Sequence, residues 1–299
     1  MEIPIISKPN LYLLLGNFYV SCRPEIAKHT VNALPKPYSG AYLTTLCECT
    51  LLLFTMTVIQ FSDIKKADYN LVPTSSSKVP DNNGSKTGRP LSVIARQRTF
   101  LIAALGGFVS WSAMAIQMSA SPLAMTAAGY NFKQATTAVE YHLLGMFVPS
   151  FFTGTLCKWF GSRLVMLVGL LTQLTGTLLF QRGLQIHHFN LGLIIVGVGW
   201  NLGYVGASAL LTQSHLKEEK TKTHSLFEAI VMSSISISFF SSAFVVQSFG
   251  WMILTGRVTS TYLGVAILVL AIDTVFVFCK TKDIRTEIRI DETEIDVPA

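Results

Sequence analysis

Long apolar runs separated by short polar segments dominate this sequence. Each run is close to the roughly 20 apolar residues that a helix needs to cross a bilayer core about 30 Å thick. Seven runs are long enough, whereas a further apolar piece, Leu11–Cys22, is too short to cross alone, because a helix rises only about 1.5 Å per residue. The pattern predicts an all-α integral membrane protein in which residues 1–40 end a truncated preceding span. The seven predicted spans lie at about residues 41–62, 99–120, 136–157, 164–181, 190–214, 225–247 and 258–280.

The composition excludes a soluble globule. Hydrophobic residues make up 50% of the 299 residues and charged residues 13%, whereas a soluble domain typically has about 25% charged residues. The net charge of +6 does not indicate a nucleic-acid partner, because the basic residues border the apolar runs. The five cysteines have no C-x-x-C spacing and are expected as small buried side chains, so no metal or cofactor is implied.

The polar segments predict the topology. After the transmembrane helix at 41–62 comes a polar linker at 63–98, which contains "TSSSKVPDNNGSK", and the chain ends in a charged tail at 281–299. Sixteen Lys and Arg residues lie in the linker, the 158–163 turn, the 215–224 loop and the tail region, against three in the opposite loops after the linker. Positive residues are retained on the cytoplasmic side. We therefore expect a multi-pass protein of the cell or inner membrane with its linker and tail in the cytoplasm.

A compact basic turn joins the second and third of the six spans that follow the linker. It has the form G-x-L-x-x-x-F-G-x-R, with Gly154, Leu156, Gly161 and Arg163 at the marked positions. Together with "RPLSVIARQRTF", "MSASPLAM", "YHLLGMFVPSFFTG" and "GVGWNLGYVGASALL", this turn resembles the C-terminal half of bacterial-type transporters of the major facilitator superfamily, over about residues 38–280. The resemblance implies a six-helix half at 99–280, made of two inverted three-helix repeats, and solute transport by alternating access.

The sequence departs from the family in two respects. The acidic residue and the arginine of the family's loop motif are replaced by Lys158 and Trp159, so the resemblance carries over a turn and not a working charge relay. The family has twelve spans in two halves, and this sequence begins in what corresponds to the fifth or sixth. Either the chain pairs with a separately encoded N-terminal half or a second copy, or it is a fragment without transport activity.

A polar face on the 190–214 span is the first candidate for a substrate site. Asn201, Tyr204 and Ser208 follow one another at helical spacing, which places them on one face. Small residues lie on the other side of the helix and predict close approach of a neighbouring helix; these are Gly199, Gly203 and Gly206. The alternative is that the polar residues form interhelical hydrogen bonds without a ligand.

Other polar residues in the spans are further candidates, because ionisable groups at bilayer depth are costly and mark function by default. His142 and Glu140 are candidates for proton coupling, and His142 also for substrate contact, although a spacing of two residues points them to different sides. Asp273 is a third coupling candidate, for which a structural role is the alternative. Gln117 lies on the helix that lines the cavity in the resembled family. Glu228, near a span end, is either interfacial or paired.

These features favour a transporter over two alternatives. A polytopic membrane enzyme would need a clustered acid–base or metal constellation, and no H-E-x-x-H or G-x-S-x-G motif occurs. A non-transporting accessory half is the other alternative. We expect gradient-driven translocation of a small-molecule solute, which the sequence does not identify, within the lipid bilayer. The chain would act as a C-terminal half with a second half-transporter or as a homodimer.

Overall fold

The computed structural model describes residues 88–295, with side chains for residues 88–279. The predicted pieces at 1–40 and 41–62, and the linker up to residue 87, lie outside the described residues. The described part is all helical, with no strand in it. The linker end forms a short helix, α3 (Leu91–Ala95), and the last helix, α11 (Ser260–Ile295), continues beyond residue 280 into the segment predicted as a tail.

Six helical segments of this region are long and apolar enough to cross a membrane, which confirms the six spans predicted after the linker. The spans are Arg98–Ala127, Phe132–Phe160, Ser162–Arg182, Ile186–Leu211, Lys217–Phe249 and Trp251–Cys279. Four consist largely of one helix each: α4 (Arg98–Ala127), α7 (Ser162–Leu179), α8 (Ile186–Leu211) and α9 (Lys220–Phe249). The others are broken, into α5 (Phe132–Phe147) and α6 (Ser150–Phe160), and into α10 (Trp251–Ile253), the π-helical turn η3 (Leu254–Thr259) and α11.

Local sequence signals set the ends of these helices. Asn131 caps α5, because its side chain accepts from the backbone N–H of Gln134 while the Gln134 side chain accepts from the backbone N–H of Asn131. Pro149 lies in the break between α5 and α6, where it lacks the N–H that a continuous helix would use. Gly161 has φ +86° and alone joins α6 to α7, so the turn predicted at 158–163 is shorter than expected, because residues 158–160 continue α6 and residues 162–163 begin α7.

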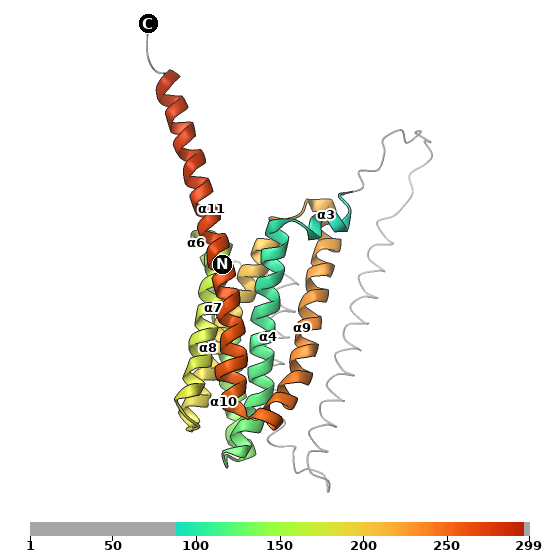
Figure 1. The fold of residues 1–299 in the computed structure, drawn as a ribbon, viewed down its shortest axis with the longest axis vertical. Helices are drawn as coiled ribbons and strands as arrows, with labels where there is room; N and C mark the ends of the chain where they lie inside the picture. Colours follow the sequence, from blue (N-terminus) through green and yellow to red (C-terminus); the bar gives the residue numbers. More distant parts are fainter. Residues whose placement is uncertain (1–87, 296–299) are drawn as a thin grey trace, which may run out of the picture. The chain divides into compact units, whose positions relative to one another are not determined.

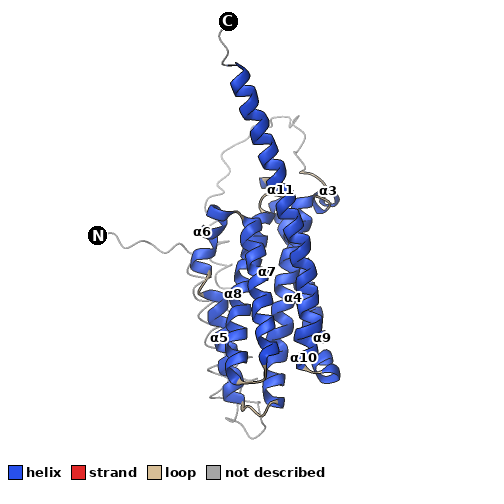
Figure 2. Cartoon of the chain, turned by 60° about the vertical axis from the view of Figure 1, so that its left-hand side comes forward, coloured by secondary structure: helices blue, strands red, loops and turns tan. Residues whose placement is uncertain are grey.

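The helices form a bundle around α8, which packs against α4, α5 and α7 (Figures 1 and 2). α9 packs against α4, and α11 packs against α7 and α4. One end of the bundle carries α3, the start of α4, the turn between α6 and α7 and the loop between α8 and α9; we name it the Arg98 end. The opposite end carries α10 and the loops after α4 and α7 (Figure 1).

Glycines bring α7 and α8 into backbone contact. A Cβ atom on Gly169 of α7 would lie 2.2 Å from the backbone nitrogen of Gly203 on α8. A Cβ atom on Gly199 would lie 2.5 Å from the backbone nitrogen of Gln173, and one on Gly206 would lie 2.7 Å from that of Met166. The small-residue stripe predicted on α8 is thus confirmed as a packing surface.

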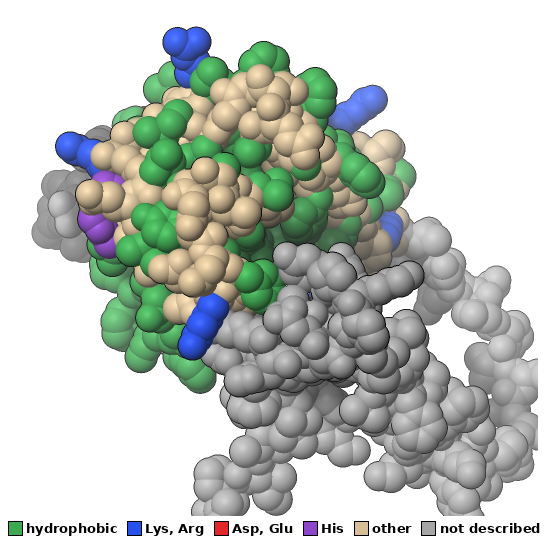
Figure 3. Space-filling model, turned by 90° about the horizontal axis from the view of Figure 1, so that it is seen from below, with side chains coloured by type: hydrophobic (Ala, Val, Ile, Leu, Met, Phe, Trp, Pro, Cys, Tyr) green, Lys and Arg blue, Asp and Glu red, His purple; other side chains and the backbone are tan. Residues whose placement is uncertain are grey.

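The outer surface of the bundle is apolar, as expected of a protein in a lipid bilayer. Large hydrophobic side chains stand out on several helices, among them Phe151, Phe240 and Phe278, which are 74%, 85% and 72% exposed. Seen from the α10 end, the described surface is a mixture of hydrophobic and uncharged atoms with scattered Lys and Arg side chains (Figure 3). The apolar surface and the six spans together make the chain a multi-pass membrane protein.

Candidate functional site

Asn201 is buried at the break between α5 and α6, where its amide nitrogen and its amide oxygen are both hydrogen-bonded. Its Nδ2 atom donates to the carbonyl oxygen of Met146 at 2.9 Å and to Ser150 Oγ at 2.6 Å, and its Oδ1 atom accepts from Thr153 Oγ1 at 2.6 Å. The side chain thereby binds the segment that Pro149 interrupts. This geometry corresponds to the alternative of interhelical hydrogen bonding, and it separates Asn201 from Tyr204, which faces α4 and α9.

His142 and Gln117 are also enclosed between helices. The Nδ1 atom of His142 lies 2.8 Å from the carbonyl oxygen of Leu193 on α8, while its buried Nε2 atom has no partner among the described residues. Gln117 Oε1 accepts from Thr177 Oγ1 at 3.0 Å, which ties α4 to α7. Both side chains have 0% exposure. Glu140 is half-buried two residues before His142 on α5. The structure therefore does not bring these three residues together with Tyr204.

Tyr204 and Glu228 form a polar pair between α8 and α9. The Tyr204 hydroxyl donates to Glu228 Oε1 at 2.8 Å. Both side chains are half-buried, and Ser208 is half-buried one turn along α8 from Tyr204. The ion pairs of residues 88–279 do not include Glu228. A carboxylate inside a span without a cationic partner is unfavourable unless function retains it, so this pair is a candidate site.

Aromatic rings surround the Tyr204–Glu228 pair. Tyr204 is stacked with Trp200 at a centroid distance of 5.7 Å and with Phe227 at 6.2 Å, at interplanar angles of 13° and 21°. Trp111 of α4 meets Trp200 and Tyr204 edge-on, at 4.7 and 5.6 Å. We name Trp111, Trp200, Tyr204, Phe227 and Glu228 the aromatic face. Buried apolar side chains form one cluster at the Arg98 end, which includes Phe100, and another at the α10 end, which includes Trp251. Trp111 and Tyr204 pack against both clusters, so the face lies between the two ends of the bundle.

Asp273 lies at the Arg98 end, where it joins three helices. Its Oδ1 atom accepts from Arg98 Nε at 2.6 Å and its Oδ2 atom from Arg163 Nε at 3.1 Å, while the carboxylate is 4% exposed. Arg98 also lies over the ring of Phe276, 4.2 Å from its centroid. The loop-motif arginine, Arg163, therefore pairs with α11, and two guanidinium groups neutralise the carboxylate.

The other loop-motif residues lie on α6 and the turn after it. Gly154 is exposed, and nothing lies within 4 Å of the position that a Cβ atom on it would take. Leu156 is half-buried, and Gly161 supplies the positive φ of the turn. Lys158 and Trp159, which replace the family's acidic residue and arginine, are both exposed. The described geometry is thus that of a turn with one ion-paired arginine.

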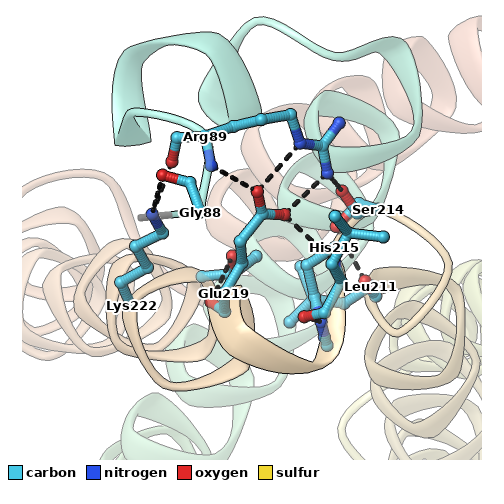
Figure 4. A network of polar contacts seen from close by, with 9 residues as sticks. Gly88, Arg89, Leu211, Ser214, His215, Glu219 and Lys222 are labelled. Carbon is cyan, nitrogen blue, oxygen red and sulfur yellow. Dashed lines mark hydrogen bonds and ion pairs between the residues drawn. The ribbon is translucent and has the colours of Figure 1, made fainter. Parts of the chain in front are cut away.

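A second charged network anchors the end of the linker (Figure 4). Glu219, in the loop before α9, is enclosed and accepts from the backbone N–H of Arg89 at 2.7 Å and from its guanidinium Nε and Nη2 atoms at 2.9 and 2.7 Å. The same guanidinium donates to the carbonyl oxygen of Ser214 at 3.3 Å, and Lys222 Nζ donates to the carbonyl oxygens of Gly88 and Arg89. The Glu219 carboxylate raises the pKa of the Arg89 guanidinium, so the contact stays ionised at neutral pH.

Sequence reasoning missed part of this arrangement. Trp111 was not selected because a single aromatic residue in an apolar helix gives no signal that its ring meets two others. The sequence leaves open whether Glu228 is interfacial or paired, and in the structure it accepts from Tyr204. Arg89 and Glu219 are 130 residues apart. Among residues 88–279, no group of three or more His, Cys, Asp or Glu side chains has a metal-binding arrangement.

Comparison with known proteins gives two curated relatives. The riboflavin transporter RfnT of Brucella anthropi is 31% identical over 229 residues, which are 76% of this chain and 54% of RfnT. The uncharacterized MFS-type transporter YddS of Bacillus subtilis is 27% identical over 125 residues, which are 39% of this chain and 27% of YddS. This chain spans about half the length of RfnT. No family model and no solved structure matches it.

These relatives agree with the apolar helical bundle and with the sequence motifs. Both are named as transporters and not as enzymes. The match to RfnT extends over three quarters of this chain, and six spans are present in the described part. The recognition made from the sequence is therefore confirmed, and this multi-pass membrane protein belongs with the transporters of the major facilitator superfamily.

Proposed function

We propose that this chain moves a small solute across the membrane as the C-terminal half of an alternating-access transporter driven by an ion gradient. The observation that carries the proposal is the Tyr204–Glu228 pair, because a half-buried carboxylate without a cationic partner among residues 88–279 lies in a span and accepts from a tyrosine that contacts a half-buried tryptophan. Transporters of this class bind solutes near the bilayer midplane, between two halves that rock against one another. The relatives' names support the same class of function.

Riboflavin is the first candidate substrate, because RfnT is named as a riboflavin transporter. The Arg98 end, with the linker and the tail, faces the cytoplasm in this proposal, because Lys and Arg concentrate there. Labelling of single cysteines placed in the α8–α9 loop and in the loop after α7, by a membrane-impermeant maleimide, tests this orientation.

The proposed coupling group is a carboxylate within a span. Of the candidates from the sequence, Asp273 is neutralised by two arginines and His142 is enclosed between α5 and α8. Glu140 remains a candidate on α5. Glu228 is added by the structure, since it lies in a span and forms no ion pair within residues 88–279. A carboxylate that binds and releases protons during transport must not be held permanently by a cation, and Glu228 meets this condition within residues 88–279.

The test is uptake of radiolabelled riboflavin into proteoliposomes with an imposed pH gradient. The full 299-residue chain is reconstituted alone, at low and high density, and together with the part of RfnT that it does not match. We expect uptake that a protonophore reduces in at least one of these arrangements, and a strong loss in Glu228→Gln. Absence of uptake in every arrangement, with correctly folded protein, would contradict transport of riboflavin by this chain.

A non-transporting accessory half is the second candidate function. The observation that favours it is the exposed pair Lys158 and Trp159 in the turn, where the resembled family has an acidic residue and an arginine. In that case the chain should bind a partner half and change the partner's transport rate without contributing to the substrate site. Restoring the family pattern with Lys158→Asp and Trp159→Arg should then have no effect on uptake, whereas a transporting half should gain rate.

A further inference from the structure

The aromatic face combines ring surfaces with an acceptor. Trp200, Tyr204 and Phe227 lie in nearly parallel planes, and Trp111 stands edge-on to the first two. Phe227 has 0% exposure and Trp200 8%, whereas Trp111 and Tyr204 are half-buried. The inner two rings therefore hold the outer two in fixed orientations. Preorganised rings bind a flat partner with little loss of side-chain entropy.

The polar groups of the aromatic face indicate which hydrogen-bonding groups a ligand would have. The Tyr204 hydroxyl occupies one oxygen of Glu228, and no other hydrogen bond to the carboxylate comes from residues 88–279. Its second oxygen can accept a hydrogen bond from a ligand N–H. The indole N–H of Trp200 is buried and has no acceptor in the described structure. A buried donor without a partner is unusual and marks a place where a ligand acceptor would be favourable.

Few charged or titratable side chains of residues 88–279 lie near Glu228. His224 is four residues earlier on α9, and it is close enough to interact electrostatically with Glu228. Tyr204 of α8 donates to Glu228, and Trp111 of α4 contacts the ring of Tyr204. No Lys or Arg of residues 88–279 forms an ion pair with Glu228. Within residues 88–279 the carboxylate is therefore not held by a cation, and one of its oxygens is open to a ligand.

We propose that the aromatic face is the substrate platform of this half and that it takes a flat, fused-ring heteroaromatic solute with a ring N–H group. The ring system packs against Trp111 and Tyr204, and the N–H donates to Glu228. The inference rests on the proposed transport function and names its substrate class. It excludes open-chain polyols and tetraalkylammonium ions as preferred ligands, because a polyol lacks a ring surface and a tetraalkylammonium ion lacks an N–H donor.

The test measures binding and not transport, so that it can fail separately from the proposed function. The full chain in lipid nanodiscs is titrated with lumichrome, a flat tricyclic heterocycle with ring N–H groups. Binding is followed by quenching of tryptophan fluorescence and checked by calorimetry. Ribitol and tetramethylammonium are the comparison probes. We expect saturable binding of lumichrome and none of ribitol.

Three variants locate the site. Trp111→Leu should weaken lumichrome binding by about five- to tenfold, as expected for loss of one aromatic packing partner, and Trp111→Phe should restore most of it. Glu228→Gln should weaken binding about tenfold, because it replaces a charged acceptor by a neutral one. Trp159→Phe is the matched control, since Trp159 is 74% exposed on the turn after α6 and should leave the affinity unchanged.

The outcomes separate the two proposals. Lumichrome binding that depends on Trp111 and Glu228 supports the platform, even if no riboflavin uptake is found. Uptake that persists while these variants leave lumichrome binding unchanged overturns the platform and leaves transport standing. Absence of lumichrome binding to protein with wild-type size-exclusion and circular-dichroism profiles also overturns it. Binding of tetramethylammonium in place of lumichrome overturns it in favour of a cation site.

Discussion

Replacement of Gly169 by alanine tests the close contact between α7 and α8. The added Cβ atom would lie 2.2 Å from the backbone nitrogen of Gly203 and 2.6 Å from its Cα atom. Non-bonded heavy atoms pack at about 3.5–4.0 Å. Both neighbours are backbone atoms of a helix, which cannot rotate away as a side chain would. The two helices must therefore move apart by about 1 Å or more.

The size of the effect follows from two opposing contributions. Overpacking of a well-packed contact typically costs about 1–3 kcal/mol, while alanine is favoured over glycine in a helix by about 1 kcal/mol. Gly264→Ala is the matched control, because Gly264 lies within α11 and nothing lies within 4 Å of its Cβ position. The control gains only the helix preference. Gly169→Ala should therefore be less stable than Gly264→Ala by about 1–3 kcal/mol.

The assay is the apparent melting temperature of each variant in detergent, measured by loss of the monodisperse size-exclusion peak. For a chain of this size, 1 kcal/mol corresponds to roughly 2–4 °C. We expect Gly169→Ala to melt several degrees below Gly264→Ala. Equal melting temperatures for the two variants would refute the inferred backbone contact, because both carry the same chemical change and differ only in their surroundings.

Three further perturbations test the polar contacts. Asp273→Asn should destabilise the fold by about 1–3 kcal/mol, a discounted value because Arg98 is half exposed, as measured by the melting temperature. Glu219→Gln should release the linker end, seen as faster hydrogen exchange of the backbone around Arg89 with the core unchanged. Asn201→Ala should destabilise by about 1–3 kcal/mol, because it leaves buried groups of the α5–α6 break without partners.

Each of these predictions has its own counter-result. An Asp273→Asn protein that melts at the wild-type temperature would show that the ion pairs of Asp273 with Arg98 and Arg163 do not stabilise the fold. Uniformly faster exchange in Glu219→Gln would indicate global unfolding and not a local anchor. For Asn201, the comparison is Ser208→Ala, a change on the same helix at a half-buried position. An equal effect of the two changes would remove the special role assigned to the Asn201 contacts.

The spans and the glycine stripe were predictable because their signals are local. Length and hydropathy define a transmembrane helix within a single stretch of sequence, and Gly199, Gly203 and Gly206 repeat at helical spacing. The tight turn at Gly161 was predictable for the same reason. Span ends shifted by a few residues, as in α4, which extends to Ala127 where the prediction ended at 120. Ser119 and Ser121 near this end of α4 bond to carbonyl oxygens of the same helix, so their hydroxyls are satisfied inside it.

The polar contacts were less predictable because their partners are distant in the chain. Asp273 pairs with Arg98 and Arg163, which are 175 and 110 residues away. Helical spacing grouped Asn201 with Tyr204, but three residues also turn a helix by about 300°, enough to give two side chains different neighbours. Pro149 was the available signal, since a proline inside a span frees backbone groups that a buried amide can satisfy.

The glycines of α8 have a mechanical consequence. Besides its contact with α7, this helix approaches α5 so closely that a Cβ atom on Gly197 would lie 2.6 Å from the carbonyl oxygen of His142. Helices whose backbones are in such contact cannot slide or rotate past one another without steric clashes, so we expect α5, α7 and α8 to move as one rigid unit. Movement within this half is then expected outside these three helices, and α9 is one of the helices outside them. Glu228 lies on α9, so the residue proposed to hold the solute can move relative to Tyr204, its hydrogen-bond partner on the rigid helix α8.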